Sequence, residues 1–232
     1  MPPNNVIEFV SKAERNHMLG AAVLFPLARL IQSGSIDPEA VTRSQFLSAL
    51  RKLGKSHENA FEVYTDLVEE EMRLVAHCIK VAEPRSAIVL LFTLIEGEIN
   101  TLLRAHLRIR GFATNSISDA LRGTDFETKI DVMLPLLEVE VPARIRNVAL
   151  QCKAIRNLVV HNKATPSLMS QDGDRPSDVE IASERASKFF KENPVSRLQR
   201  DIRKLVNDGI HESWAVQWAS HLFAKYYVRG AV

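Results

Sequence analysis

Apolar residues recur along almost the whole chain at intervals of three and four, the spacing that places them on one side of an α-helix. The alternation of apolar and polar residues that is typical of a β-strand is nearly absent. We therefore predict an all-α protein, a helical bundle with additional helices at both ends. The predicted helices cover about 16–31, 37–53, 56–81, 86–110, 124–137, 142–162, 178–192, 194–206 and 212–228.

Glycine and proline mark the expected ends of these helices. The Ser-Gly-Ser at 33–35 ends the first helix, and Asp37-Pro38-Glu39 starts the second, with Asp37 as the cap. The Glu-Pro at 83–84 breaks the third helix, and Gly111 ends the fourth. The Asn-Asp-Gly at 207–209 is expected to separate the last two helices.

No internal repeat or linker divides the chain, so we expect a single domain over residues 1–232. Residues 1–55 form a helical hairpin in this prediction, and residues 56–162 form the bundle core. The segment 163–177 is rich in Gly, Pro, Ser and Asp, which is typical of an exposed loop. Residues 178–232 add the C-terminal helices.

Composition is that of an ordinary globular protein, with 46% hydrophobic and 25% charged residues among 232. The net charge of +2 does not require a nucleic-acid partner, so any phosphate contact has to be a local patch. The N-terminus does not resemble a signal peptide. The longest apolar stretch, 87–95, is about half of a membrane span, so we expect a cytoplasmic protein without a membrane.

Cysteine and histidine spacings point to no metal site. Cys78 and Cys152 lie inside predicted helices and outside any CxxC pattern, so both are expected to be reduced core residues. The histidines lack the spacing of a metal cluster, and the chain has no Gly-rich phosphate loop and no GxSxG. We expect no metal and no cofactor.

The predicted helix 142–162 carries the most informative residues. An ideal helix turns about 100° per residue, which separates an apolar stripe from a polar one. A polar stripe that includes Leu150 and Val160 at its edges suggests a helix covered on both sides, as at a subunit interface. The apolar stripe is Ile145, Val148, Cys152, Ile155 and Val159, and the polar stripe is Arg146, Lys153, Asn157 and His161.

Arg156 and His161 supply a permanent cation and a group that transfers protons near neutral pH. These two groups suit RNA cleavage by the adjacent 2′-hydroxyl, which leaves a 2′,3′-cyclic phosphate and needs no divalent ion. They lie about 140° and 7.5 Å apart on an ideal helix, so two copies that face each other across a twofold axis would converge more easily on one phosphate. The alternative is that His161 and Asn162 simply end the helix.

The motif Arg156-Asn157-x3-His161-Asn162, after a hydrophobic bundle helix, resembles the HEPN superfamily (higher eukaryotes and prokaryotes nucleotide-binding). The resemblance covers about residues 61–162. It implies a four-helix core, usually dimeric, in which the two motifs meet at the interface. Many members are metal-independent endoribonucleases in toxin–antitoxin, abortive-infection and other antiviral systems.

The resemblance assigns catalytic roles to Arg156 and His161 and a supporting role to Asn157. Glu96 corresponds to an acidic residue that often faces the site, although Glu98 is an equally charged candidate. One of these two glutamates is expected to meet a cation, with Arg156 the nearest candidate. The resemblance further implies an RNA substrate, a homodimer with the motifs at its interface, and a partner such as an antitoxin or defence-system protein.

Weaker RNA-binding candidates are the basic residues on two predicted helices. A solvated helix face is the more common explanation for such stripes. Trp214, Trp218 and Tyr226 can stack bases, but their spacing more often indicates core packing. The basic candidates are Lys153, Arg146, Arg197, Arg200, Arg203 and Lys204.

Two further functions remain open at this point. The chain can be a non-catalytic HEPN-like dimer that binds RNA or nucleotide or assembles with a protein. It can also be a helical scaffold in which the Arg-x4-His spacing is a coincidence. Accessibility of Arg156 and His161 in a cleft is the observation that separates the nuclease from the scaffold.

Overall fold

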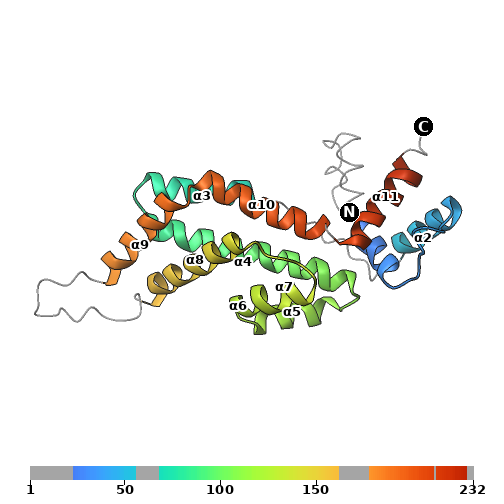
Figure 1. The fold of residues 1–232 in the computed structure, drawn as a ribbon, viewed down its shortest axis with the longest axis horizontal. Coiled ribbons are helices and arrows are strands. Elements are labelled where there is room, and N and C mark those ends of the chain that lie inside the picture. The colour runs from blue at the N-terminus through green and yellow to red at the C-terminus, as the bar shows by residue number, and fades with distance from the viewer. Residues whose placement is uncertain (1–22, 56–67, 162–177, 212, 229–232) are drawn as a thin grey trace, which may run out of the picture. The chain divides into compact units, whose positions relative to one another are not determined.

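The computed structural model describes residues 23–55, 68–161, 178–211 and 213–228 (Figure 1). Every regular element within these ranges is helical, which confirms the all-α prediction. The elements are the helix Val23–Gln32, α2 (Arg43–Lys55), α3 (Val68–Lys80), α4 (Pro84–Ile109), α5 (Thr114–Gly123), α6 (Phe126–Thr128), η1 (Lys129–Met133), α7 (Leu134–Leu136), α8 (Ala143–His161), α9 (Asp178–Glu192), α10 (Val195–His211), α11 (Trp214–Phe223) and η2 (Ala224–Val228).

The chain divides into two compact units, and each is described by itself. Unit 1 comprises Met1–Tyr64, Ala105–Ile117 and Ile210–Val232, and unit 2 comprises Thr65–Arg104 and Ser118–Gly209. Three of the four boundaries fall inside the helices α4, α5 and α10, and the fourth, between residues 64 and 65, lies outside the described residues. For that reason no linker is visible in the sequence.

Unit 1 has a core of aliphatic side chains around Phe46, which is fully buried. The ring of Tyr226 lies 5.5 Å from that of Phe46, and its hydroxyl donates to the carbonyl of Val41 at 2.9 Å. Trp218 also packs against this cluster, whereas Trp214 is 48% exposed. Core packing is thus confirmed for Trp218 and Tyr226 but not for Trp214.

Unit 2 is organised around α4, which buries Leu91, Ile99 and Leu102 completely or almost so. Helix α8 lies against α4, and the buried thiol of Cys152 is 3.6 Å from the carbonyl oxygen of Ile88. Burial raises the pKa of the Cys152 thiol, as expected for an inert core cysteine. Helix α10 completes this packing, because side chains from α4, α8 and α10 line one small apolar cavity of about 20 Å³.

The second helix begins six residues later than predicted. Asp37 does accept backbone N–H groups, from Glu39 at 3.0 Å and Ala40 at 3.4 Å, but it closes a separate turn. The helix α2 starts after Thr42, whose backbone N–H and hydroxyl both donate to the Gln45 side chain at 2.9 Å. A capping arrangement between residues 42 and 45 therefore replaces the predicted start.

The predicted break at 207–209 is wrong, because α10 continues through it to His211. Gly209 is there for close packing: a Cβ on it would lie 2.9 Å from a methyl carbon of Leu102 and 3.4 Å from Val139. The helix α5 was not predicted, and the helix expected at 124–137 contains a π-helical turn, η1. The predicted loop 164–177 and the predicted helix starts near 16 and 56 lie outside the described residues.

By length and composition α4 could cross a membrane, with a mean hydropathy of 1.6 over its most apolar window. Half of that window is buried against the rest of the protein, as in the core helix of a bundle. The uninterrupted apolar run in the sequence is shorter than this helix because Glu96, Glu98 and Arg104 interrupt the pattern.

Candidate functional site

Helix α8 has the two faces that its sequence predicts. Cys152, Ile155 and Val159 are buried on one side, against α4. The polar positions Lys153 and Asn157 on the other side are half-buried rather than exposed. Val160, at the edge of the polar stripe, is 37% exposed, so coverage of this helix on both sides, as at a subunit interface, stays a prediction.

Arg156 is half-buried beside an aromatic ring. Its guanidinium carbon lies 5.6 Å from the centre of the Phe92 ring of α4, and Phe92 in turn packs edge-on against Phe126 at 4.9 Å. Nη1 of Arg156 donates a hydrogen bond to Oδ1 of Asn157 at 3.1 Å. Among the described residues, no carboxylate lies within ion-pair distance of Arg156, so its charge is held by a ring and an amide.

His161 is the last residue of α8, and its side chain lies outside what the structure describes. The backbone is α-helical from Arg156 to His161, so the two residues are about 7.5 Å and 140° apart on the helix. The two positions thus lie on different sides of the helix.

Glu96 lies one helical turn after Phe92, on the same side of α4, but its ionic partner is not Arg156. Oε1 of Glu96 is 3.3 Å from Nζ of Lys129. The pairing of Glu96 with Arg156 was expected from the sequence, and Lys129 takes that place instead. Glu98 points elsewhere: it lines the small cavity that also contains Asp201 of α10.

Lys129 is a site residue that sequence reasoning missed. It is only 3% exposed, and the buried ammonium has the 37%-exposed side chain of Glu96 as its partner. The sequence does indicate that this side chain faces the core, because Lys129 lies on the same side of the helix as the apolar series Phe126, Ile130 and Leu134. A lysine at such a position is buried with the rest of the face only when it is paired, here with Glu96.

The cations of the α8 polar stripe are already paired within the chain. Arg146 makes two hydrogen bonds to the carboxylate of Asp131, at 2.6 and 2.7 Å, and Lys153 reaches Glu127 at 2.8 Å. Hydrogen bonding to Arg146 holds the pKa of Asp131 below its usual value, and the same contact raises the pKa of Arg146. To contact RNA, Arg146 and Lys153 would first have to give up their ion pairs with Asp131 of η1 and Glu127 of α6.

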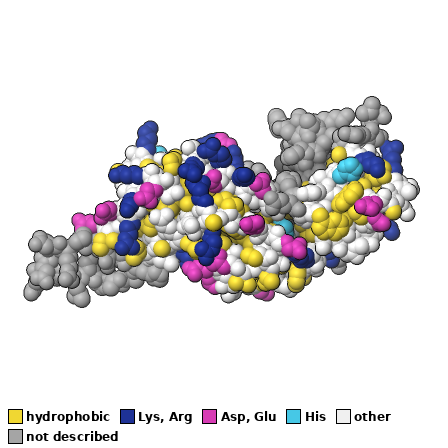
Figure 2. Space-filling model, viewed as in Figure 1, with side chains coloured by type: hydrophobic (Ala, Val, Ile, Leu, Met, Phe, Trp, Pro, Cys, Tyr) yellow, Lys and Arg dark blue, Asp and Glu magenta, His cyan; other side chains and the backbone are white. Residues whose placement is uncertain are grey.

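The cations of α10 divide into paired and unpaired ones. Nη2 of Arg203 is 3.4 Å from the carboxylate of Glu69 on α3. Arg197, Arg200 and Lys204 are exposed and carry no ion pair to any part of the chain that the structure describes. Figure 2 shows Lys and Arg side chains over the region of α3 and α10.

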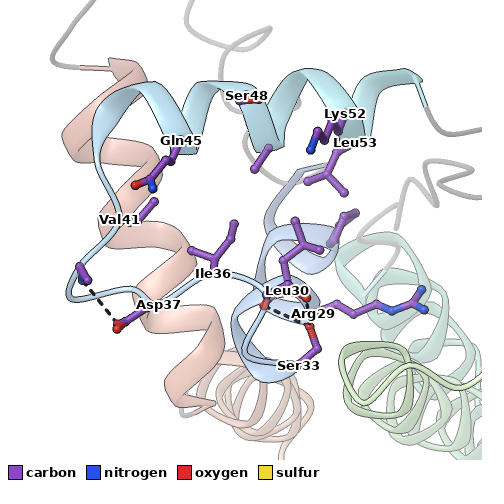
Figure 3. A pocket seen from close by; sticks show the side chains of 14 residues that line it. Arg29, Leu30, Ser33, Ile36, Asp37, Val41, Gln45, Ser48, Lys52 and Leu53 are labelled. Atoms are coloured by element: carbon purple, nitrogen blue, oxygen red, sulfur yellow. Dashed lines mark hydrogen bonds between the residues drawn. The ribbon is translucent and has the colours of Figure 1, made fainter.

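An open groove of about 790 Å³ lies in unit 1, between the helix Val23–Gln32 and α2 (Figure 3). Its lining includes the apolar side chains of Leu30, Ile36 and Leu53 and the polar side chains of Gln45 and Lys52. None of the residues predicted to form a site lines this groove.

No family model matches the chain, and neither the curated proteins nor the solved structures contain one that is significantly similar. Within the described ranges, no group of three or more His, Cys, Asp or Glu side chains is placed to hold a metal ion. The site residues are therefore interpreted from their own geometry and from the motif alone.

Proposed function

We propose that the protein is a metal-independent endoribonuclease of the HEPN type. The observation that carries this proposal is the environment of Arg156. A half-buried guanidinium without a carboxylate partner among the described residues is costly to maintain for structure alone. It retains its charge for an incoming anion, on the same helix as His161.

The proposed reaction is transesterification at an RNA phosphodiester. The 2′-oxygen gives up its proton and attacks phosphorus, the bond to the 5′-oxygen breaks, and that oxygen takes a proton. His161 transfers a proton in this scheme, and Arg156 stabilises the extra negative charge on the phosphoryl oxygens. Asn157 keeps the guanidinium in place through its 3.1 Å hydrogen bond.

The active form in this proposal is a homodimer. Because positions 156 and 161 lie on different sides of α8, a phosphate is approached more easily by Arg156 of one protomer and His161 of the other. The proposal also keeps the cytoplasm as the location, which was expected from the apolar pattern and the N-terminus. A toxin or antiviral effector is the biological class, which comes from the motif's resemblance.

Purified protein incubated with total RNA in EDTA tests the proposal. We expect cleavage by the wild type, and its loss in both Arg156→Ala and His161→Ala, with unchanged circular dichroism. Exposed Arg51→Ala in α2 is the matched control for removing one arginine and should cleave normally. RNA that is bound but never cut would point instead to the non-catalytic RNA-binding module.

A further inference from the structure

Helix α10 presents a cationic face that the proposed chemistry does not use. Arg197, Arg200 and Lys204 recur at intervals of three and four, so they share one side of the helix. They span about 10 Å along it. Asp208 is the acidic residue near the end of the same exposed face.

The opposite face of α10 is anchored in unit 2, which fixes the direction of the cations. Leu198, Ile202 and Leu205 are each at most 5% exposed. They line the small cavity shared with Ile95 of α4 and Val148 of α8. The three cations therefore project from a packed helix rather than from a mobile segment, which lowers the entropic cost of binding an anion.

The cations on this face differ from neighbouring cations, which are held by carboxylates of the same chain. On α8, Arg146 and Lys153 are neutralised by Asp131 and Glu127. On α10 itself, Arg203 is held by Glu69. We propose that Arg197, Arg200 and Lys204, the α10 cation face, form a docking surface for the phosphate backbone of single-stranded RNA.

A polynucleotide fits this face better than a membrane does. Membrane-surface helices place apolar side chains in the lipid, whereas the apolar side of α10 is buried inside the protein. The exposed positions Ser196, Arg197, Arg200 and Lys204 are all polar. Two arginines also favour phosphate oxygens, which their planar guanidinium groups bind through two hydrogen bonds.

The docking surface is tied to the proposed active site through α8. Asp201 of α10 pairs with Arg144 in the first turn of α8, and Arg144 lies about 18 Å along that helix from Arg156. The identity of the polyanion as RNA rests on the proposed function, whereas the docking surface itself is tested separately.

The test measures binding of a fluorescent single-stranded DNA oligonucleotide, which lacks the 2′-hydroxyl and is not cleaved in the proposed reaction. Arg197→Ala/Arg200→Ala/Lys204→Ala should weaken binding by tenfold or more. Between about 50 and 200 mM salt, it should lower the slope of log affinity against log salt by about 2, since each lost phosphate contact contributes about 0.7. Arg156→Ala should cost less than about threefold, as expected for one phosphate contact.

A control variant removes the same charge from exposed positions elsewhere in unit 2, as Arg122→Ala/Arg185→Ala/Lys188→Ala. Equal weakening in the control, or an unchanged slope in the α10 variant, would overturn the docking surface. So would binding to anionic phosphatidylserine vesicles in place of the oligonucleotide. If the α10 dependence holds but RNA is never cut, the nuclease proposal fails alone; if RNA is cut with no α10 dependence, only the docking surface fails.

Discussion

Helices α8 and α10 look alike in sequence but differ in what their cations meet. Both pack an apolar face into unit 2 and carry basic residues on the other side. On α8 the carboxylates of Asp131 and Glu127 hold Arg146 and Lys153. On α10 three cations have no partner in the described chain, which shows that tertiary partners, and not charge counts, decide which cations are available to a ligand.

Arg156 is the exception on α8, and its removal should have the largest effect. It lies against Phe92 instead of a carboxylate. We expect Arg156→Ala to lower kcat/KM for RNA cleavage by at least about a hundredfold, the usual loss when one preorganised charge on the transition state is removed. Arg200→Ala on α10 should cost only about two- to threefold, mainly in KM, as expected for one phosphate contact among several.

These two numbers are measured by steady-state cleavage of one RNA oligonucleotide. Arg156→Lys keeps the charge but loses the planar, two-pronged geometry, so it should recover only part of the activity. Equal losses for Arg156→Ala and Arg200→Ala would remove the distinction between the chemical and the docking cation.

The Glu96–Lys129 pair should respond unequally to removal of either partner. Glu96→Gln leaves the 3%-exposed ammonium of Lys129 without a counterion, which should cost about 2 kcal/mol in the free energy of unfolding. Lys129→Met removes the buried charge and leaves Glu96 partly solvated, so it should cost less than about 1 kcal/mol. Urea unfolding of both variants measures the difference, and a larger cost for Lys129→Met would contradict the account.

The pairing of the α8 cations with carboxylates of α6 and η1 could not be predicted from the sequence, for a physical reason. Periodicity predicted most of the helices and the buried positions Cys152, Ile155 and Val159 of α8, because burial follows the apolar pattern. It could not show that Asp131 lies 2.6 Å from Arg146, because that contact depends on how two separate segments pack. Gly209 was predicted to lie between two helices for the same reason. Its actual role, close packing against Leu102, also depends on how separate segments pack.

Removing the carboxylate partners of the α8 cations should allow α8 to bind phosphates, as is proposed for α10. Glu127→Gln/Asp131→Asn removes both carboxylate partners while keeping similar shapes. We expect oligonucleotide binding to tighten by about two- to fivefold, with a steeper salt dependence, because Arg146 and Lys153 become available to phosphates. Glu140→Gln/Glu184→Gln, at two exposed glutamates that form no ion pair with the described residues, is the control for the change in net charge. An equal gain there would attribute the effect to overall charge.

The smallest expected effect is a shift in the titration of Asp131. Its pKa is lowered chiefly by hydrogen bonding to Arg146, so Arg146→Ala should return it toward its ordinary value near 3.8. Because the folded-state pKa is depressed, the stability from this pair is present above the unfolded pKa and is lost as the pH falls through the folded pKa. Carboxyl carbon NMR from pH 2 to 6 measures the shift, and an unchanged pKa in Arg146→Ala would show that the pair does not form in solution.

The central claim is tested most directly by the chemistry of the cleaved ends. An RNA oligonucleotide incubated with the wild type in EDTA should yield a 2′,3′-cyclic phosphate on one fragment and a 5′-hydroxyl on the other. The same oligonucleotide with one 2′-deoxy sugar at the cleaved position should stay intact there. Cleavage that persists at the deoxy position, or fragments that end in a 3′-hydroxyl, would contradict the mechanism built on Arg156 and His161.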